Sequence, residues 1–253
     1  MSRVIAILNQ KGGVGKTTTT INLAAYLAKL GRRVLIVDID PQGNASSGLG
    51  LDKQTLEATL YDVLFGRAEL SKTIRRATTH SLDLLPSNSQ LAAAEVELVG
   101  LVGRELKLRQ ILSSLDHYDY ILIDCPPSLG LLSINALTAA DEVLIPVQTE
   151  YYAMEGLSQL LDTIQQVRQA LNPNLNLLGI ILTMFDTRTS LSEQVQAEVE
   201  RHFSGKVFTT VIPRNIRLAE APSFGRTIHE HDPMSRGAIA YQQLAKELEE
   251  RLL

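Results

Sequence analysis

The chain alternates between short runs of apolar residues and longer stretches in which apolar residues recur at helical spacing. Runs of Val, Ile and Leu are typical of strands buried on both faces, and helical spacing is typical of helices that cover a sheet. Strands are predicted at Arg3–Leu8, Arg33–Val37, Leu82–Leu85, Tyr120–Ile123, Glu142–Val147, Leu175–Leu182 and Lys206–Ile212. Helices are predicted at Thr17–Lys29, Thr59–Phe65, Ser89–Leu115, Met154–Leu171, Ser190–Phe203 and Gly237–Leu252. This order predicts an α/β fold with one mainly parallel sheet flanked by helices.

The rest of the sequence narrows the class of protein. No linker rich in Pro, Gly or Ser divides residues 1–253, so a single domain is predicted. Cys125 is the one cysteine, which excludes an internal disulfide and a multi-cysteine zinc site, and we expect it to be a packing residue. No apolar run suits a signal peptide or a membrane-spanning helix, so a cytoplasmic protein is expected. The net charge of −4 gives no general reason to expect a nucleic-acid partner.

A loop rich in glycine connects the first predicted strand to the first predicted helix. It reads Asn-Gln-Lys-Gly-Gly-Val-Gly-Lys-Thr-Thr over Asn9–Thr18. Glycines let backbone N–H groups approach phosphate oxygens, and the helix N-terminus adds a positive dipole. Lys16 can reach the β- and γ-phosphates of ATP, the Thr17 hydroxyl can bind Mg²⁺, and Thr18 is expected near the α-phosphate. The common phosphate-loop formula has Gly at the position of Gln10, so only a variant form with an additional lysine fits.

Carboxylates end two further predicted strands. Asp38 and Asp40 follow the strand at Arg33–Val37, and Asp124 follows the strand at Tyr120–Ile123. A single Asp there can simply cap a loop, but the carboxyl ends of parallel strands meet at the edge where the glycine-rich loop also lies. The apolar residues that lead into Asp124 are typical of the acidic residue that holds Mg²⁺ through a water molecule. Asp38 is expected to stabilise the loop and the water shell of the metal.

The glycine-rich loop resembles that of the deviant Walker A ATPases, in which Lys11 is the additional lysine. Three further segments, Asp40–Asn44, Leu182–Asp186 and Val211–Ser223, are similar to segments of the ParA/Soj family of chromosome-partitioning ATPases. The resemblance extends over nearly the whole chain. It implies an ATPase with ATP and Mg²⁺ as cofactors and a homodimer that closes on two ATP molecules. It further implies DNA binding without sequence preference, a ParB-type partner that stimulates hydrolysis, and association with the nucleoid.

The resemblance also implies roles for single residues. Lys11 would reach across the dimer interface to the partner subunit's nucleotide, and Asp40 would orient and help to activate the hydrolytic water. Pro213 would pack on the adenine ring, and Asn215 would bond its edge. The expected catalytic residues are Lys11, Lys16 and Asp40, and the expected metal site is Thr17 with Asp124 through water. The expected nucleotide contacts are Lys11, Gly12, Gly13, Val14, Gly15, Lys16, Thr17, Thr18, Pro213 and Asn215.

No segment of the sequence is strongly basic. Residues 184–236 hold seven Lys or Arg against seven Asp or Glu, so a DNA-binding patch must gather arginines from separate segments. Arg188, Arg214 and Arg217 are the predicted DNA contacts, because their two loops would lie at the edge of the dimer. The glycine-rich loop begins near the amino terminus, so we expect no N-terminal helix-turn-helix extension that reads a specific operator.

Three related functions compete with DNA partitioning. A MinD-like ATPase of division-site placement would end in a basic amphipathic helix that binds lipid. Here Leu244, Leu248 and Leu252 form an apolar stripe with an acidic polar face, so we expect this helix to pack on the sheet without stable membrane association. An iron–sulfur reductase resembling the nitrogenase iron protein needs two cysteines per subunit, and this chain has one. A ligase-like synthase, such as a cobyrinate or dethiobiotin enzyme, would need additional substrate-binding segments, and we identify none.

Overall fold

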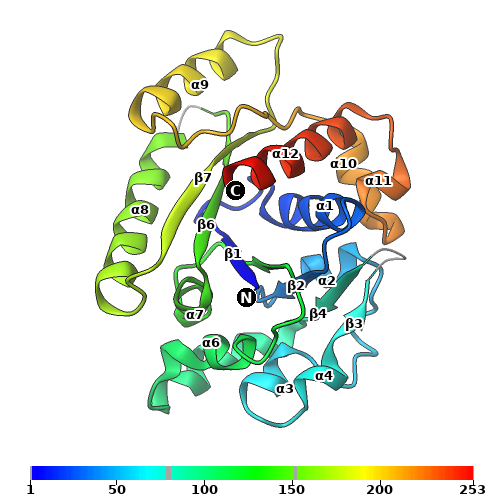
Figure 1. Ribbon diagram of the computed structural model, residues 1–253, viewed down its shortest axis with the longest axis vertical. Helices are drawn as coiled ribbons and strands as arrows, with labels where there is room; N and C mark the ends of the chain where they lie inside the picture. Colours follow the sequence, from blue (N-terminus) through cyan, green and yellow to red (C-terminus); the bar gives the residue numbers. More distant parts are fainter. Residues whose placement is uncertain (1, 78–80, 151–152, 253) are drawn as a thin grey trace.

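The computed structural model describes residues 2–77, 81–150 and 153–252, and its centre is one seven-stranded sheet (Figure 1). The strand order is β3-β4-β2-β5-β1-β6-β7, and all neighbouring pairs are parallel except β3 with β4. The strands are β1 (Arg3–Ile7), β2 (Val34–Asp38), β3 (Arg75–Arg76), β4 (Leu82–Leu85), β5 (Tyr120–Asp124), β6 (Glu142–Gln148) and β7 (Asn176–Thr183). The predicted α/β class with a mainly parallel sheet is confirmed.

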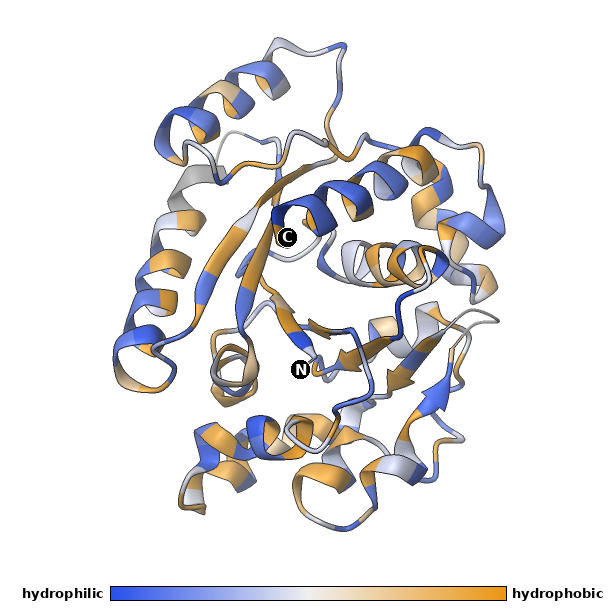
Figure 2. Cartoon of the chain, viewed as in Figure 1, coloured by the Kyte–Doolittle hydropathy of each residue, from blue (hydrophilic) through white to orange (hydrophobic). Residues whose placement is uncertain are grey.

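Helices cover both faces of the sheet, and each face has its own apolar core. One face carries α1 (Lys16–Lys29) and α12 (Arg236–Leu252), and the other carries α6 (Lys107–Leu112), α7 (Leu131–Ala139) and α8 (Ala153–Ala170). The other helices are α2 (Asn44–Gly48), α3 (Leu60–Leu64), α4 (Leu70–Thr73), α5 (Ala94–Glu97), α9 (Ser190–His202), α10 (Ile216–Glu220) and α11 (Ile228–His231). Single 3-10 turns are η1 (Ser89–Ala93), η2 (Leu98–Gly100), η3 (Arg104–Leu106) and η4 (Ala221–Phe224). Figure 2 shows hydrophobic central strands and helices of mixed hydropathy, as this layering requires.

The register of the three central strands sets the position of the candidate site. Asp124 at the end of β5 lies opposite Ile7 of β1 on one side and opposite Asp38 of β2 on the other. One residue, Leu8, separates the end of β1 at Ile7 from the glycine-rich loop, which leads into α1. The loop and both carboxylates therefore meet at one edge of the sheet, as the sequence predicts.

Two predicted elements are wrong. The strand expected at Lys206–Ile212 makes only isolated bridges, at Val207 and at Pro213, because the carboxylate of Glu247 on α12 accepts the N–H groups of the two threonines between them. The single helix expected at Ser89–Leu115 is a series of short turns. Two glycines interrupt it, and Gly103 has a φ of 67°, a left-handed conformation that ends a helix.

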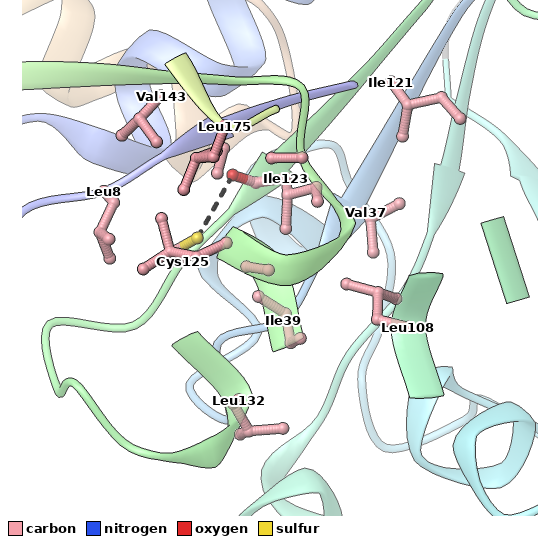
Figure 3. Close-up of a cluster of buried hydrophobic side chains, with 14 of the residues drawn as sticks. Leu8, Val37, Ile39, Leu108, Ile121, Ile123, Cys125, Leu132, Val143 and Leu175 are labelled. Atoms are coloured by element: carbon pink, nitrogen blue, oxygen red, sulfur yellow. Dashed lines mark hydrogen bonds between the residues drawn. The ribbon is translucent and has the colours of Figure 1, made fainter. Parts of the chain in front are cut away.

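Helix α7 was not predicted. Its sequence, Leu-Leu-Ser-Ile-Asn-Ala-Leu-Thr-Ala, is apolar on almost every side, so it lacks the stripe that identifies a surface helix. The helix is buried beneath the sheet and packs beside the loop that follows Asp124. Cys125 begins that loop and lies among Leu8, Ile39 and Leu132 (Figure 3). It is 1% exposed and burial raises the pKa of its thiol, so its role as a packing residue is confirmed.

Candidate functional site

The glycine-rich loop is held in the open shape that phosphate binding needs. Gly13 and Gly15 have φ values of 76° and 89°, which favour glycine, and α1 begins directly after them at Lys16. A Cβ atom placed on Gly12 or Gly13 would meet nothing within 4 Å, so this side of the loop faces open space. The Oγ1 of Thr183 donates to the carbonyl of Val14 at 2.8 Å and ties the loop to the end of β7.

Lys16, Thr17 and Asp124 are brought together as predicted. Lys16 is 7% exposed, and its Nζ donates to the carbonyl of Lys11 at 3.0 Å. Burial lowers the pKa of Lys16, and the negative charges of nearby Asp124 and Asp40 oppose this effect. The Oγ1 of Thr17 donates to Oδ2 of Asp124 at 2.8 Å. A hydroxyl and a carboxylate thus lie side by side beneath the loop, which is the oxygen pair that a Mg²⁺ site uses.

Asp38 and Asp40 sit beside this pair. Asp38 is fully buried, and its Oδ2 accepts the backbone N–H and the hydroxyl of Ser46 at 2.8 and 2.7 Å. Burial raises the pKa of Asp38, and it also raises the pKa of Asp124, with the charge of Asp38 adding to the effect. Asp40 is 6% exposed, and its Oδ1 accepts only the N–H of Gln42, at 2.9 Å, among the described residues. Its other carboxylate oxygen is available to orient a water molecule.

A cavity of about 480 Å³ opens over the glycine-rich loop. Lys16, Thr17 and Asp40 line its floor, and Pro127 from the loop after β5 lines its wall. Arg226, which the sequence reasoning did not select, also lines this cavity. The cavity has the size and the mixture of polar groups expected of a nucleotide phosphate site.

A second cavity of about 330 Å³ continues from the first. Thr18 and Met184 line both cavities, whereas Pro213 and Asn215 line only the second. The Oδ1 of Asn215 is buried and has no hydrogen-bond partner among the described residues. A buried acceptor without a partner is costly, and the amino group of an adenine ring would satisfy it. The geometry therefore fits an adenine base next to Pro213.

Lys11 does not point into either cavity. Its Nζ donates to Oε2 of Glu150 at 2.8 Å, and both side chains are more than two-fifths exposed. Its backbone N–H donates to Oδ1 of Asn9 at 3.0 Å, which fixes the start of the loop. The lysine is thus positioned at the outer rim of the site rather than over its own phosphate cradle.

The predicted DNA contacts come from two loops that meet. The backbone N–H of Arg214 donates to the carbonyl of Phe185 at 3.1 Å. Phe185 directly precedes Asp186 and lies three residues before Arg188 in the sequence. Arg188 binds both oxygens of Asp186, at 2.9 and 2.7 Å, and holds the pKa of that carboxyl below its usual range. Arg217 pairs with Glu220 at 2.8 Å. The side chain of Arg214 has no ion pair among the described residues.

The sequence reasoning missed several residues that organise the site. Thr20 donates from Oγ1 to Oδ1 of Asp124 at 3.0 Å, and its spacing of three from Thr17 on one helix could have indicated it. Ser87, after β4, donates to the carbonyl of Asp40 at 2.8 Å, and no local pattern marks it. Met184 has a φ of 52°, a left-handed conformation rare outside glycine, at the junction of the two cavities.

Comparisons with known proteins agree on one family. A family model described as an AAA domain matches residues 2–177. The chain is 57% identical over 249 residues to the sporulation initiation inhibitor protein Soj of Bacillus subtilis, with 98% of each chain covered. It is 54% identical to the chromosome-partitioning ATPase Soj of Thermus thermophilus, with 99% of this chain and 96% of that one covered. The solved structure of cobyrinic acid a,c-diamide synthase from Mycobacterium smegmatis, with ADP and magnesium, matches with a TM-score of 0.88 and 42% identity over 100% of this chain and 96% of that chain.

Proposed function

Because the chain belongs to the Soj/ParA family of chromosome-partitioning ATPases, we propose that it is an ATP-driven switch whose closed homodimer binds DNA without sequence preference. A ParB-type partner stimulates hydrolysis, which opens the dimer and releases the DNA. The observation that carries this proposal is the pair of joined cavities, with Lys16, Thr17 and Asp40 in one and Asn215 in the other. Asp124 is buried directly behind Thr17, whose hydroxyl donates to it. The protein works in the cytoplasm, on the nucleoid.

The described residues fit ATP with Mg²⁺. Lys16 exchanges its contact with the carbonyl of Lys11 for the β- and γ-phosphates, and loop N–H groups bind the same oxygens. Thr17 and Asp124 would hold the metal, the carboxylate through water. Mg²⁺ bound there would neutralise negative charge on the phosphates. Asn215 accepts the amino group of adenine, which distinguishes adenine from a base that presents a carbonyl there.

Hydrolysis depends on Asp40 and dimerisation on Lys11. The free oxygen of Asp40 accepts a hydrogen bond from the hydrolytic water and aligns it with the terminal phosphate. Lys11 leaves Glu150 and contacts the nucleotide of the partner subunit. Two such lysines make ATP the bridge between two subunits, so the loss of the terminal phosphate weakens the dimer.

Within residues 2–77, 81–150 and 153–252, none of the helices has the length and hydropathy of a membrane span. Two alternatives fit less well. Leu244 and Leu248 of α12 are fully buried, so the apolar stripe that a MinD-like lipid anchor needs packs inside the protein. A synthase shares 42% identity with the chain, but relatives with partitioning names share 50–54% over nearly their whole length, and the proposal follows these.

The test of this function is DNA binding under nucleotide control. Fluorescence anisotropy on two duplexes of unrelated sequence should show equal binding with Mg²⁺-ATP and little binding with ADP. Lys16→Ala should bind ATP about 10–150-fold more weakly and should bind DNA more weakly in turn, because the loss of a charged hydrogen-bonding group costs about 1.5–3 kcal/mol. Lys72→Ala, on an exposed lysine whose side chain is 76% accessible, is the matched control. DNA binding that ignores the nucleotide would refute the switch.

A further inference from the structure

Glu95 binds the start of a distant helix, and it is not among the residues that line the two cavities. It lies on α5, and its carboxylate accepts the backbone N–H groups of Leu131 at 2.8 Å and Leu132 at 3.2 Å. These are the first two residues of α7, whose N–H groups have no acceptor within the helix. A carboxylate at this end also interacts favourably with the helix dipole. Glu95 is thus the cap of a helix that starts 36 residues later in the chain.

Gly130 lets the carboxylate come this close. A Cβ atom added to Gly130 would lie 2.8 Å from the carboxyl carbon of Glu95, and nearer still to its oxygens. Any side chain at this position would therefore push the carboxylate away from the start of α7. Gly130 itself has no left-handed φ, so close approach to Glu95 is the reason for a glycine here.

The capped helix closes the loop that follows Asp124 and lines the phosphate cavity. Residues 125–130 connect Asp124, at the end of β5, to α7, and Pro127 in this loop lines the phosphate cavity. The Oγ of Ser133, in the first turn of α7, donates to the carbonyl of Ser128. The loop is therefore fixed at one end by the sheet and at the other by the first turn of α7. A shift of that turn changes where Pro127 stands relative to the phosphates.

We propose that Glu95 is a positioning residue for the loop that follows Asp124 (residues 125–130), and that it acts by fixing the point at which α7 begins. The proposal rests on the metal role proposed for Asp124. It assigns no contact between Glu95 and nucleotide or metal, because the carboxylate is engaged by the helix amides. With Glu95 in place, the loop is preorganised for Mg²⁺-ATP, and without it the loop samples other positions.

The neighbours of Glu95 show that its contact can be removed without loss of the fold. Ala94 and Leu98, on either side, are fully buried in the core and hold the segment on the protein. Glu97, two residues on, serves a different purpose, since its carboxylate accepts the hydroxyl of Tyr61 and pairs with Arg67. Glu97→Ala is therefore a matched control, with the same charge change on the same segment and, among the described residues, no hydrogen bond from Glu97 to α7.

The experiment compares Glu95→Ala, Glu95→Gln and Glu97→Ala with the wild-type protein. Amide hydrogen exchange at Leu131 and Leu132 should accelerate in Glu95→Ala and remain slow in Glu97→Ala. The Mg²⁺ concentration for half-maximal hydrolysis should rise about tenfold in Glu95→Ala, in line with the loss of a helix cap. Glu95→Gln retains one acceptor oxygen, so its amide exchange rate and its Mg²⁺ requirement should lie between those of Glu95→Ala and those of the wild-type protein. Binding of ATP without Mg²⁺ should stay the same in all four proteins.

A second variant separates positioning from simple stability. Gly130→Ala keeps Glu95 but displaces its carboxylate, so it should reproduce the raised Mg²⁺ requirement of Glu95→Ala. If the Mg²⁺ requirement of Glu95→Ala stays at the wild-type value while its amides exchange faster, Glu95 only stabilises α7 and the proposal fails. A wild-type Mg²⁺ requirement in Asp124→Ala is a different result, because it would overturn the metal role itself.

Discussion

The Nζ of Lys11 donates to Oε2 of Glu150 of the same chain at 2.8 Å, while the backbone carbonyl of Lys11 accepts the Nζ of Lys16 at 3.0 Å. The ion pair holds the lysine at the rim of the site, where the side chains are 41% and 45% exposed. The proposed dimer requires this lysine to reach a partner's nucleotide. The Lys11–Glu150 ion pair would therefore compete with formation of the proposed dimer, because it holds Lys11 on its own subunit.

Glu150→Gln should strengthen ATP-dependent dimerisation, because it releases Lys11 without altering the phosphate cradle. Exposed ion pairs contribute about 0.2–1 kcal/mol each, and a dimer releases two of them, so the dimer dissociation constant should fall by at most about thirtyfold. Analytical ultracentrifugation with Mg²⁺-ATP measures this constant. Glu69→Gln breaks a comparable exposed pair, with Lys72 at 2.9 Å, and should leave it unchanged. Weaker dimerisation of Glu150→Gln would mean that Glu150 itself contacts the partner.

Asp40→Ala should bind ATP and dimerise, yet hydrolyse ATP about 10²–10⁴-fold more slowly, as expected when a group that orients the attacking water is lost. The phosphate cradle does not depend on this carboxylate, so gel filtration with Mg²⁺-ATP should show a lasting dimer. Asp116→Ala, at a side chain that is 95% exposed, should behave as the wild-type protein does. Normal phosphate release by Asp40→Ala would show that another residue positions the water.

Gly12→Val should bind ATP and remain a monomer. A Cβ atom at Gly12 meets nothing within 4 Å in the single chain and the position has no left-handed φ, so the fold tolerates the branched side chain. In a face-to-face dimer the same side chain would stand between the two loops. Light scattering with Mg²⁺-ATP tests this, with calorimetry to verify nucleotide binding. A normal ATP-induced dimer would rule out the face-to-face arrangement.

The sequence predicts those parts of the site that depend on strand ends and local spacing. Thr17 and Asp124 could be placed together because the glycine-rich loop and an apolar strand ending in Asp must share one edge of a parallel sheet. Glu95 could not be predicted in the same way. Its partners lie in α7, a helix too uniformly apolar to show a stripe, and its own segment had the appearance of one long helix.

Ion pairs between exposed side chains also cannot be predicted from the sequence. Arg188 is predicted as a DNA contact, and the fold pairs it with both oxygens of Asp186. Local charge counting cannot show this, because the same arginine and aspartate could equally face away from one another. Arg214 differs, since it is exposed and without an ion pair among the described residues.

The DNA surface proposed here consists of Arg188, Arg214 and Arg217, and its carboxylate partners determine how it should respond to mutation. Exposed pairs such as that of Arg188 with Asp186 are weak, so a DNA phosphate can replace the carboxylate. Asp186→Asn should therefore tighten binding to any duplex, because it removes a competitor and a negative charge.

Charge reversal gives the opposite result. Arg188→Glu or Arg217→Glu should weaken binding to two unrelated duplexes equally and leave ATP-dependent dimerisation intact. Each phosphate contact contributes about 0.9 to the slope of log affinity against log salt, so losing one contact per subunit should reduce the slope of the dimer by about 1.8. Arg76→Glu, on β3 at the far edge of the sheet, is the control and should keep the wild-type slope. Fluorescence anisotropy across a salt series with Mg²⁺-ATP measures the slope for the wild-type protein and for each of the three arginine variants. An unchanged slope in both reversal variants would place the DNA on another face of the protein.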